Sequence, residues 1–207
     1  MIKLEVTGDL WIATLVRPEK ANALTLEMLR ELADIARRAQ DAKALILTGE
    51  GKAFSAGMDL KAAKDGLATD PVWEELSSAL AALPGFTIAA LNGTVAGGAM
   101  GMVLACDLRV ASPQAKVFYP VMKLGFLPQP SDPGRLAGLV GPARARLILM
   151  GGAKLAAEEA ERYGLFDRIS STPLETALEL AQDVLGADRS HGTAIKQMIS
   201  AGDRMKP

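Results

Sequence analysis

Gly51-Lys-Ala-Phe-Ser-Ala-Gly-Met-Asp-Leu60 and Asn92-Gly-Thr-Val-Ala-Gly-Gly-Ala-Met-Gly101 are the two stretches that decide the fold of this chain. Each follows an apolar run typical of a buried strand, turns through small residues and enters a helical pattern, which Asp59 is expected to cap in the first stretch. Small residues let a ligand approach the main chain, and unpaired N–H groups at a helix start carry partial positive charge. Two such helix starts aimed at one point would stabilise a negatively charged oxygen. Taken singly, either stretch is explained as well by tight packing of a helix on a strand.

The rest of the pattern predicts an α/β core with a mainly parallel sheet. A turn at residues 7–9 joins two β-prone runs, and Thr25 is placed to cap an amphipathic helix. The expected strands cover residues 2–6, 10–16, 44–48, 86–91 and 108–111. The expected helices cover residues 25–40, 97–105, 142–150, 155–163, 174–185 and 193–201, with a proline-broken segment at 119–133 and a further helix beginning near Pro133.

Composition favours a single domain over residues 1–207, in which about 190–207 form the last helix and tail. Apolar residues make up 49% of the chain, and 23 basic residues nearly balance 24 acidic ones, so no positive field suggests nucleic acid or a membrane as partner. Cys106 is the single cysteine, which excludes an internal disulfide and favours the cytoplasm. The N-terminal residues lack the apolar run of a secretory signal or a membrane span.

Together, in this order and separation, the two glycine-bearing stretches resemble the signature segments of the crotonase (enoyl-CoA hydratase/isomerase) superfamily. The resemblance extends to residues 17–24, 105–109 and 164–167, and thus over nearly the whole chain. It implies a crotonase (ClpP-like) fold of repeated ββα units, with mainly parallel sheets and surrounding helices. It also implies an acyl-CoA substrate, no cofactor other than the CoA within that substrate, and a homotrimer or dimer of trimers.

The resemblance assigns site residues one by one. The backbone N–H groups of Met58 and Gly98 would form an oxyanion hole. Lys20 and Lys52 match lysines near the nucleotide phosphates, although a solvated surface lysine explains each almost equally well. The positions that match contacts with the substrate or its CoA moiety are Lys20, Ala21, Lys52, Ala53, Ser55, Ala56, Gly97 and Tyr119. No metal is implied, since His191 is the only histidine and is expected at the start of the last helix.

The sequence departs from the hydratase pattern at both acid–base positions. The two glutamates that add water in hydratases correspond to Gly101 and Val121, so neither carboxylate is present. Other branches of the family place a working group on the loop that here contains Gln129 and Asp132. Asp132 is the only acid of that loop, and capping of the helix near Pro133 is expected in preference to catalysis. Tyr119 could point into the site, but a half-buried aromatic beside a strand is the simpler expectation.

Three classes of function stay open from the sequence. The first is an acyl-CoA enzyme of the lyase or isomerase type that isomerises, decarboxylates or hydrolyses a thioester. The second is a CoA-thioester-binding or regulatory protein without catalysis, and the third is a structural oligomer without a ligand. The family commonly continues for several more helices beyond the position of Pro207, so the acyl pocket is expected to be more open or to be covered by a neighbouring subunit.

Overall fold

The predicted N-terminal hairpin forms one edge of the larger of two sheets. The structure is a computed structural model that describes residues 1–204, with side-chain surroundings up to residue 200. The larger sheet has the strand order β1-β2-β3-β5-β7-β10, and only the β1–β2 pair is antiparallel. Its strands are β1 (Ile2–Thr7), β2 (Leu10–Leu15), β3 (Ala44–Gly49), β5 (Phe86–Leu91), β7 (Leu108–Ala111) and β10 (Arg168–Ile169).

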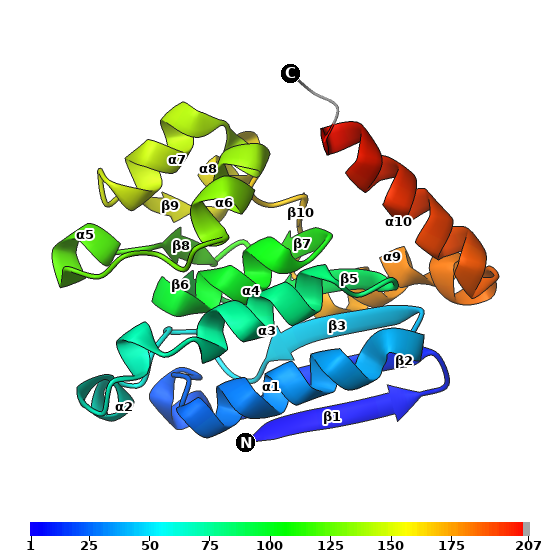
Figure 1. The fold of residues 1–207 in the computed structure, drawn as a ribbon, viewed down its shortest axis with the longest axis horizontal. Helices are drawn as coiled ribbons and strands as arrows, with labels where there is room; N and C mark the ends of the chain where they lie inside the picture. The colour runs from blue at the N-terminus through cyan, green and yellow to red at the C-terminus, as the bar shows by residue number, and fades with distance from the viewer. Residues whose placement is uncertain (205–207) are drawn as a thin grey trace.

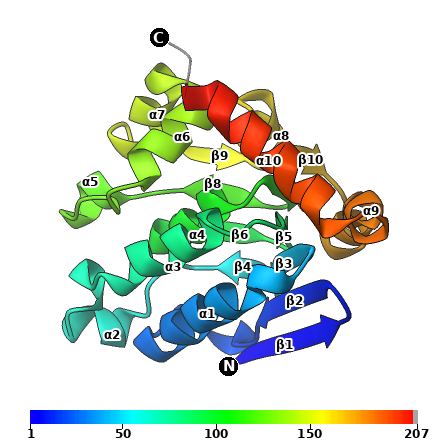
Figure 2. The ribbon, with the colours of Figure 1, turned by 45° about the vertical axis from the view of Figure 1, so that its right-hand side comes forward.

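Short strands that follow β3, β5 and β7 along the chain build the second sheet, whose order is β4-β6-β8-β9. Figure 2 shows these strands beside the larger sheet, with β4 nearest the N-terminal elements. The first three are parallel and β9 is antiparallel to β8. Each passage from the large sheet to the small one thus forms a ββα unit. The strands are β4 (Ala53–Ser55), β6 (Thr94–Ala96), β8 (Lys116–Phe118) and β9 (Lys154–Ala156).

Helices cover both faces of the larger sheet (Figure 1). Helices α1, α3 and α4 pack in sequence and bury the main core, in which Leu29, Phe54 and Leu76 are fully enclosed. Helix α9 covers the opposite face of the larger sheet, where Ala177 and Ala181 pack on strands β3, β5 and β7. The helices are α1 (Leu26–Arg38), α2 (Leu60–Lys64), α3 (Val72–Ala81), α4 (Met100–Ala105), α5 (Val121–Leu124), α6 (Asp132–Val140), α7 (Pro142–Leu149), α8 (Ala157–Arg162), α9 (Pro173–Gly186) and α10 (Arg189–Arg204). Short 3₁₀ turns are η1 (Pro18–Lys20), η2 (Ala39–Asp41), η3 (Leu67–Thr69) and η4 (Gly97–Ala99).

Most expected elements are confirmed, and the differences have local causes. Thr25 caps α1 by accepting a hydrogen bond from the Met28 N–H, and Asp59 caps α2. The glycine-rich helix begins as the 3₁₀ turn η4, and the expected helix at 155–163 is preceded by strand β9. The separate second sheet was not predicted, because three-residue strands are too short to show alternation. Helix α3 was not predicted either.

Gly93, in the connection between β5 and β6, lies tightly against the connection between β3 and β4. A Cβ atom at this position would lie 2.1 Å from the carbonyl oxygen of Lys52, so Gly93→Ala must displace backbone. We expect this substitution to lower the free energy of unfolding by about 3 kcal/mol or more, measured by urea denaturation. Gly134→Ala is the matched control, because no atom lies within 4 Å of its Cβ position and the added methyl favours the helix by up to about 1 kcal/mol. Equal stability of the two variants would contradict this packing argument.

Candidate active site

The backbones of the two glycine-bearing turns contact each other just after the C-terminal ends of β4 and β6. Gly57 has φ +89°, and a Cβ atom on it would lie 2.6 Å from the Ala96 carbonyl oxygen. Gly97 has φ +56°, and its Cβ position lies 3.9 Å from the Gly57 Cα. Only glycine adopts both the positive φ and the close approach without strain. The residues that follow, Met58 and Gly98, therefore emerge side by side.

The N–H groups of Met58 and Gly98 are free to bind a ligand. The Leu24 carbonyl accepts the Asp59 N–H, and the Leu24 N–H donates to the Gly57 carbonyl. The hydrogen bonds to Leu24 therefore involve the residues before and after Met58. Gly98 is the second residue of η4, where an N–H has no partner inside the helix. Within the described residues, neither N–H donates to another backbone group. These are the two N–H groups that the sequence analysis names as the expected oxyanion donors.

A cavity of about 260 Å³ opens in front of these two amides. Among the residues predicted for the site, it is lined by Ala56, Met58, Gly97, Gly98, Tyr119 and Gln129. Its other walls are apolar and come from α2, the start of α3 and the segment around α5: they include Leu60, Trp73, Val121, Leu124, Phe126 and Leu127. Tyr119 is the only lining residue with an ionisable side chain.

Asn22 joins the loop after β2 to the loop between β3 and β4. It is fully buried in the left-handed conformation, with φ +53°. Its Nδ2 donates to the carbonyls of Glu50 (2.9 Å) and Ala53 (2.8 Å), and its Oδ1 accepts the Arg17 N–H. The Asn22 carbonyl in turn accepts the Ser55 hydroxyl, which itself accepts the Gly57 N–H at 3.1 Å. The segment that leads to Met58 is thus held by Asn22 of the loop after β2 and by Ser55 at the end of β4.

Arg17 fixes the same turn from outside. Its Nη1 lies 2.7 Å from Asp59 Oδ2 and also donates to the Ala23 carbonyl at 2.8 Å. The hydrogen bond from Arg17, with those from the first N–H groups of α2, lowers the pKa of Asp59. The cap of α2 therefore remains ionised, and the segment after Met58 stays in place.

The positions predicted for CoA contacts divide into two groups. Lys20 and Lys52 are exposed on loops that touch, since a Cβ on Gly51 would lie 2.8 Å from the Pro18 Cβ. Five of the predicted contact residues do not line the cavity itself: Lys20, Ala21, Lys52, Ala53 and Ser55. The contacts predicted at Ala53, Ser55 and Ala56 are backbone contacts, and of these groups the Ala56 N–H already donates to the Ala21 carbonyl.

Asp132 does not act as a helix cap, and this prediction was wrong. It is the first residue of α6, Ser131 occupies the cap position, and no side chain bonds the helix N–H groups there. The Asp132 carboxyl is fully buried, with Oδ2 accepting the Tyr119 hydroxyl at 2.8 Å and Oδ1 without a hydrogen-bond partner in the described part of the chain. Burial raises the pKa of Asp132 to about 6, although the Tyr119 hydrogen bond and the Arg135 charge oppose this shift.

Tyr119 is more buried than the sequence suggested, with 3% of its surface exposed. Burial and the Asp132 carboxylate raise the pKa of its phenol far above the usual value, so the hydroxyl remains protonated. Tyr119 lines the cavity, whereas the Asp132 carboxylate that accepts its hydroxyl is fully buried and does not line it.

Glu74, on the helix that the sequence did not predict, anchors the start of α6. Its carboxylate accepts the Ser131 N–H at 3.1 Å and the Ser131 hydroxyl. Burial opposes ionisation of Glu74, but these bonds outweigh it and lower the pKa. Arg135 ties the same helices together by donating to the Ser77 hydroxyl at 2.9 Å. The position of Asp132 thus depends on α3.

Trp73 lines the cavity but was not predicted as a site residue. A Cβ on Gly98 would lie 3.0 Å from its ring, and its indole N–H donates to the Leu67 carbonyl at 2.8 Å. The ring therefore closes the cavity beside one of the two amides. A signal was present in the i, i+3, i+4 spacing of Val72, Trp73, Leu76 and Leu80, which marks α3.

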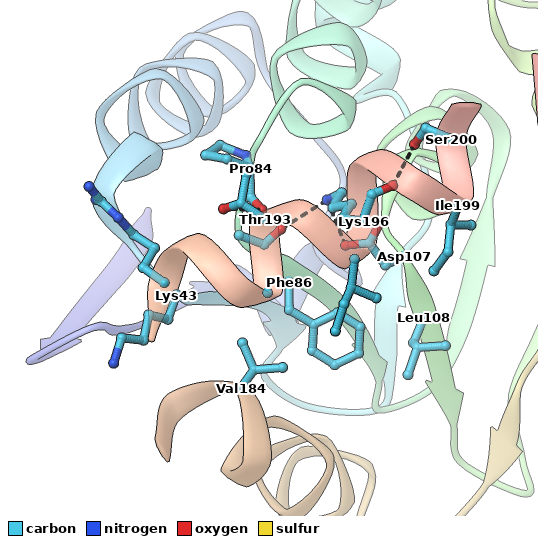
Figure 3. Close-up of a pocket in the computed structure, with 14 residues that line it drawn as sticks. Lys43, Pro84, Phe86, Asp107, Leu108, Val184, Thr193, Lys196, Ile199 and Ser200 are labelled. Atoms are coloured by element: carbon cyan, nitrogen blue, oxygen red, sulfur yellow. Dashed lines mark hydrogen bonds and ion pairs between the residues drawn. The ribbon is translucent and has the colours of Figure 1, made fainter. Parts of the chain in front are cut away.

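A second cavity, of about 360 Å³, lies at the opposite end of the larger sheet (Figure 3). Phe86 and Leu108, at the starts of β5 and β7, form its floor beneath α10. Its polar groups are paired: Lys196 Nζ lies 2.7 Å from Asp107 Oδ2 and 2.9 Å from the Gly85 carbonyl.

No cluster of potential metal ligands occurs among the described residues. Over the same part of the chain, none of the helices has the length and apolar character that crossing a membrane requires.

Comparison with known proteins gives the family. The chain matches the enoyl-CoA hydratase/isomerase family over residues 6–206 and belongs to it. The Mycobacterium leprae protein named "Probable enoyl-CoA hydratase echA8" is 35% identical over 200 residues, which cover 94% of this chain and 74% of that protein. "Probable enoyl-CoA hydratase echA6" of Mycobacterium tuberculosis is 39% identical over 161 residues, covering 76% and 65% of the two chains. Against these two relatives, the aligned part of this chain spans between 65% and 74% of their length.

A solved structure agrees with the sequence comparison. DspI of Pseudomonas aeruginosa is 31% identical and superposes with a TM-score of 0.89, covering 99% of this chain and 88% of that one. The predicted crotonase fold, with its ββα units and mainly parallel sheets, is therefore confirmed.

The buried Asp132 predicts a pH-dependent stability difference. The folded protein holds the Asp132 proton more tightly than the unfolded chain, so this stabilisation is present below about pH 4 and is lost as the pH rises through about 6. Asp132→Asn cannot ionise but still accepts the Tyr119 hydroxyl. We expect the free energy of unfolding of the Asn variant, relative to the parent, to rise by up to about 3 kcal/mol between about pH 4 and pH 7. A difference independent of pH in urea denaturation would contradict the raised pKa.

Proposed function

We propose that this chain binds an acyl-CoA thioester in the 260 Å³ cavity, with the carbonyl oxygen between the N–H groups of Met58 and Gly98. The observation that carries this proposal is the contact of Gly57 with Ala96 and Gly97, which presents both free amides to one cavity. Two preorganised donors in an apolar surrounding stabilise an enolate or tetrahedral oxyanion more strongly than they stabilise the neutral carbonyl. Lys20 and Lys52, exposed on adjoining loops, would attract the CoA phosphates.

The chemistry we propose is a proton shift next to the thioester, as in double-bond isomerisation, rather than hydration. Hydration needs one group to activate water and another to protonate carbon, and Gly101 and Val121 supply neither. An isomerase needs only a single proton carrier, which takes a proton from one carbon and returns it to another. Decarboxylation and thioester hydrolysis also require fewer side-chain bases than hydration. Both reactions are therefore tested as well.

The oxyanion assignment predicts a difference between two substitutions at one position. Gly98→Ala and Gly98→Pro both place a Cβ against the Trp73 ring, but only the proline removes the N–H. We expect the Pro variant to lose about 3 kcal/mol more transition-state stabilisation than the Ala variant, or roughly a hundredfold in kcat/KM. Circular dichroism checks that both variants fold. Equal turnover of the two folded proteins would rule out Gly98 as a donor.

The missing glutamates predict a difference between substrates. We expect conversion of a 3-enoyl-CoA to its 2-enoyl isomer and negligible hydration of crotonyl-CoA, both followed by the absorbance of the conjugated thioester. A hydration rate comparable with the isomerisation rate would show that another acid–base pair acts in this cavity. Malonyl-type and saturated acyl-CoA substrates, screened in parallel, test decarboxylation and hydrolysis.

A second candidate is a CoA-thioester-binding protein without turnover. The observation that favours it is the lining of the cavity, where Tyr119 is the only ionisable side chain and Asp132 is not exposed. Thermal stabilisation by acyl-CoA without conversion of any of these substrates would select this function. Absence of stabilisation by CoA or acyl-CoA would favour a structural oligomer.

We also propose a cytoplasmic homotrimer, or a dimer of trimers. Leu60 and Leu127 are 84% and 88% exposed at the mouth of the cavity, where a neighbouring subunit could cover them. Light scattering of the purified protein tests the assembly directly.

A further inference from the structure

Gly101 and Asp132 occupy one site from two different helices. A Cβ atom on Gly101 of α4 would lie 3.1 Å from Asp132 Oδ1 and 3.3 Å from Oδ2. The carboxylate of α6 therefore fills the space that a side chain at position 101 would enter. This is the position at which the hydratase pattern has a glutamate, so the acid is not simply lost from this region.

The carboxylate accepts a hydrogen bond from a residue that lines the ligand cavity. Tyr119 lines the cavity, and its hydroxyl lies 2.8 Å from Asp132 Oδ2. Oδ1 is buried and without a hydrogen-bond partner among the described residues. Leaving a carboxylate oxygen buried and unpaired is costly for a structural residue, whereas a proton acceptor requires this free basicity.

We propose that Tyr119 and Asp132 form the proton relay of this enzyme, with Tyr119 contacting the substrate and Asp132 receiving the proton through it. This inference rests on the proposed acyl-CoA function and names the single proton carrier that the function requires.

The relay balances without any further reactant. The Tyr119 oxygen takes a proton from the carbon next to the thioester carbonyl, while the phenolic proton passes to Asp132 Oδ2. The electron pair of the broken C–H bond enters the enolate, whose oxygen lies between the Met58 and Gly98 amides. The negative charge thus moves from Asp132 to the thioester oxygen. Return of a proton from Tyr119 to a different carbon completes an isomerisation. If the Tyr119–Asp132 pair first exchanges its proton with solvent, return to the same carbon replaces the original substrate hydrogen by a solvent hydrogen.

The electrostatic surroundings keep Asp132 basic but ionised near neutral pH. Burial raises its pKa to about 6, the Glu74 charge of α3 adds to this shift, and the Tyr119 hydroxyl and Arg135 of α6 oppose it. The phenol keeps its proton, because its pKa is raised by burial and by Asp132. A free tyrosinate is therefore not formed, and the two proton transfers are coupled.

The experiment follows exchange of the Cα hydrogens of butyryl-CoA in D₂O by mass spectrometry, since a saturated thioester can exchange without isomerising. We expect the parent protein to exchange them at a rate that rises with pH through an apparent pKa near 6. Tyr119→Phe and Asp132→Asn should each slow the exchange by roughly a hundredfold or more while binding of butyryl-CoA is retained. Tyr163→Phe is the matched control, because its hydroxyl also bonds a carboxylate, that of Glu159 at 2.9 Å, but away from the cavity.

The outcomes separate this inference from the proposed function. Exchange that persists in folded Tyr119→Phe and Asp132→Asn would overturn the relay and leave the oxyanion assignment intact. A parent protein that binds butyryl-CoA but exchanges no proton would overturn the relay and favour the binding protein. Failure to bind any CoA thioester would overturn the proposed function itself.

A double-substitution cycle tests the shared space by protein stability as well as by exchange. Gly101→Glu in the parent places two carboxylates in one buried volume, whereas Gly101→Glu combined with Asp132→Gly leaves room for one. We expect Gly101→Glu to destabilise the parent more than it destabilises the Asp132→Gly protein, and the combined variant to recover part of the exchange lost in Asp132→Gly. Equal destabilisation in both backgrounds would show that the two positions do not share the space.

Discussion

The contact between the Gly57 turn and the Ala96–Gly97 turn is the constraint on which the rest of the site depends. A Cβ atom at Gly57 would lie within 2.6 Å of the Ala96 carbonyl, so the parallel strands β4 and β6 can end together only because glycine is present. This contact brings two helix starts from distant parts of the chain side by side. The free amides of Met58 and Gly98 are its chemical consequence.

Much of the polar structure around the cavity serves to hold that contact. Asn22 and Arg17, from the loop after β2, bond to the residues on either side of the first turn, and Ser55 at the end of β4 accepts the Gly57 N–H. Each uses its hydrogen-bonding capacity on the protein itself. Under the proposed function, the Met58 and Gly98 amides would need no rearrangement when charge develops on a bound thioester, which is the condition for strong electrostatic stabilisation. The apolar lining strengthens the effect by excluding water.

The buried carboxylate of Asp132 lies against the position at which the hydratase pattern has a glutamate. The hydratase pattern delivers a carboxylate from the helix after the glycine turn, and this chain has Gly101 there. The space is filled instead by Asp132, whose helix is anchored to α3 by Glu74. A phenol then stands between the carboxylate and the cavity, which suits a single proton carrier better than the paired acids of hydration.

The sequence by itself determined the strand–glycine–helix segments, the caps at Thr25 and Asp59, and the family, because these follow from apolar periodicity and from residue types that act locally. It identified the residues of the two turns, but only the tertiary structure decided what Asp132 does. Ser131-Asp132-Pro133-Gly134 has the composition of a helix start, and local pattern therefore suggested a cap. The burial of Asp132 against Tyr119 and Gly101 depends on packing between α3, α4 and α6, and such contacts between distant segments leave no periodic signal in the sequence.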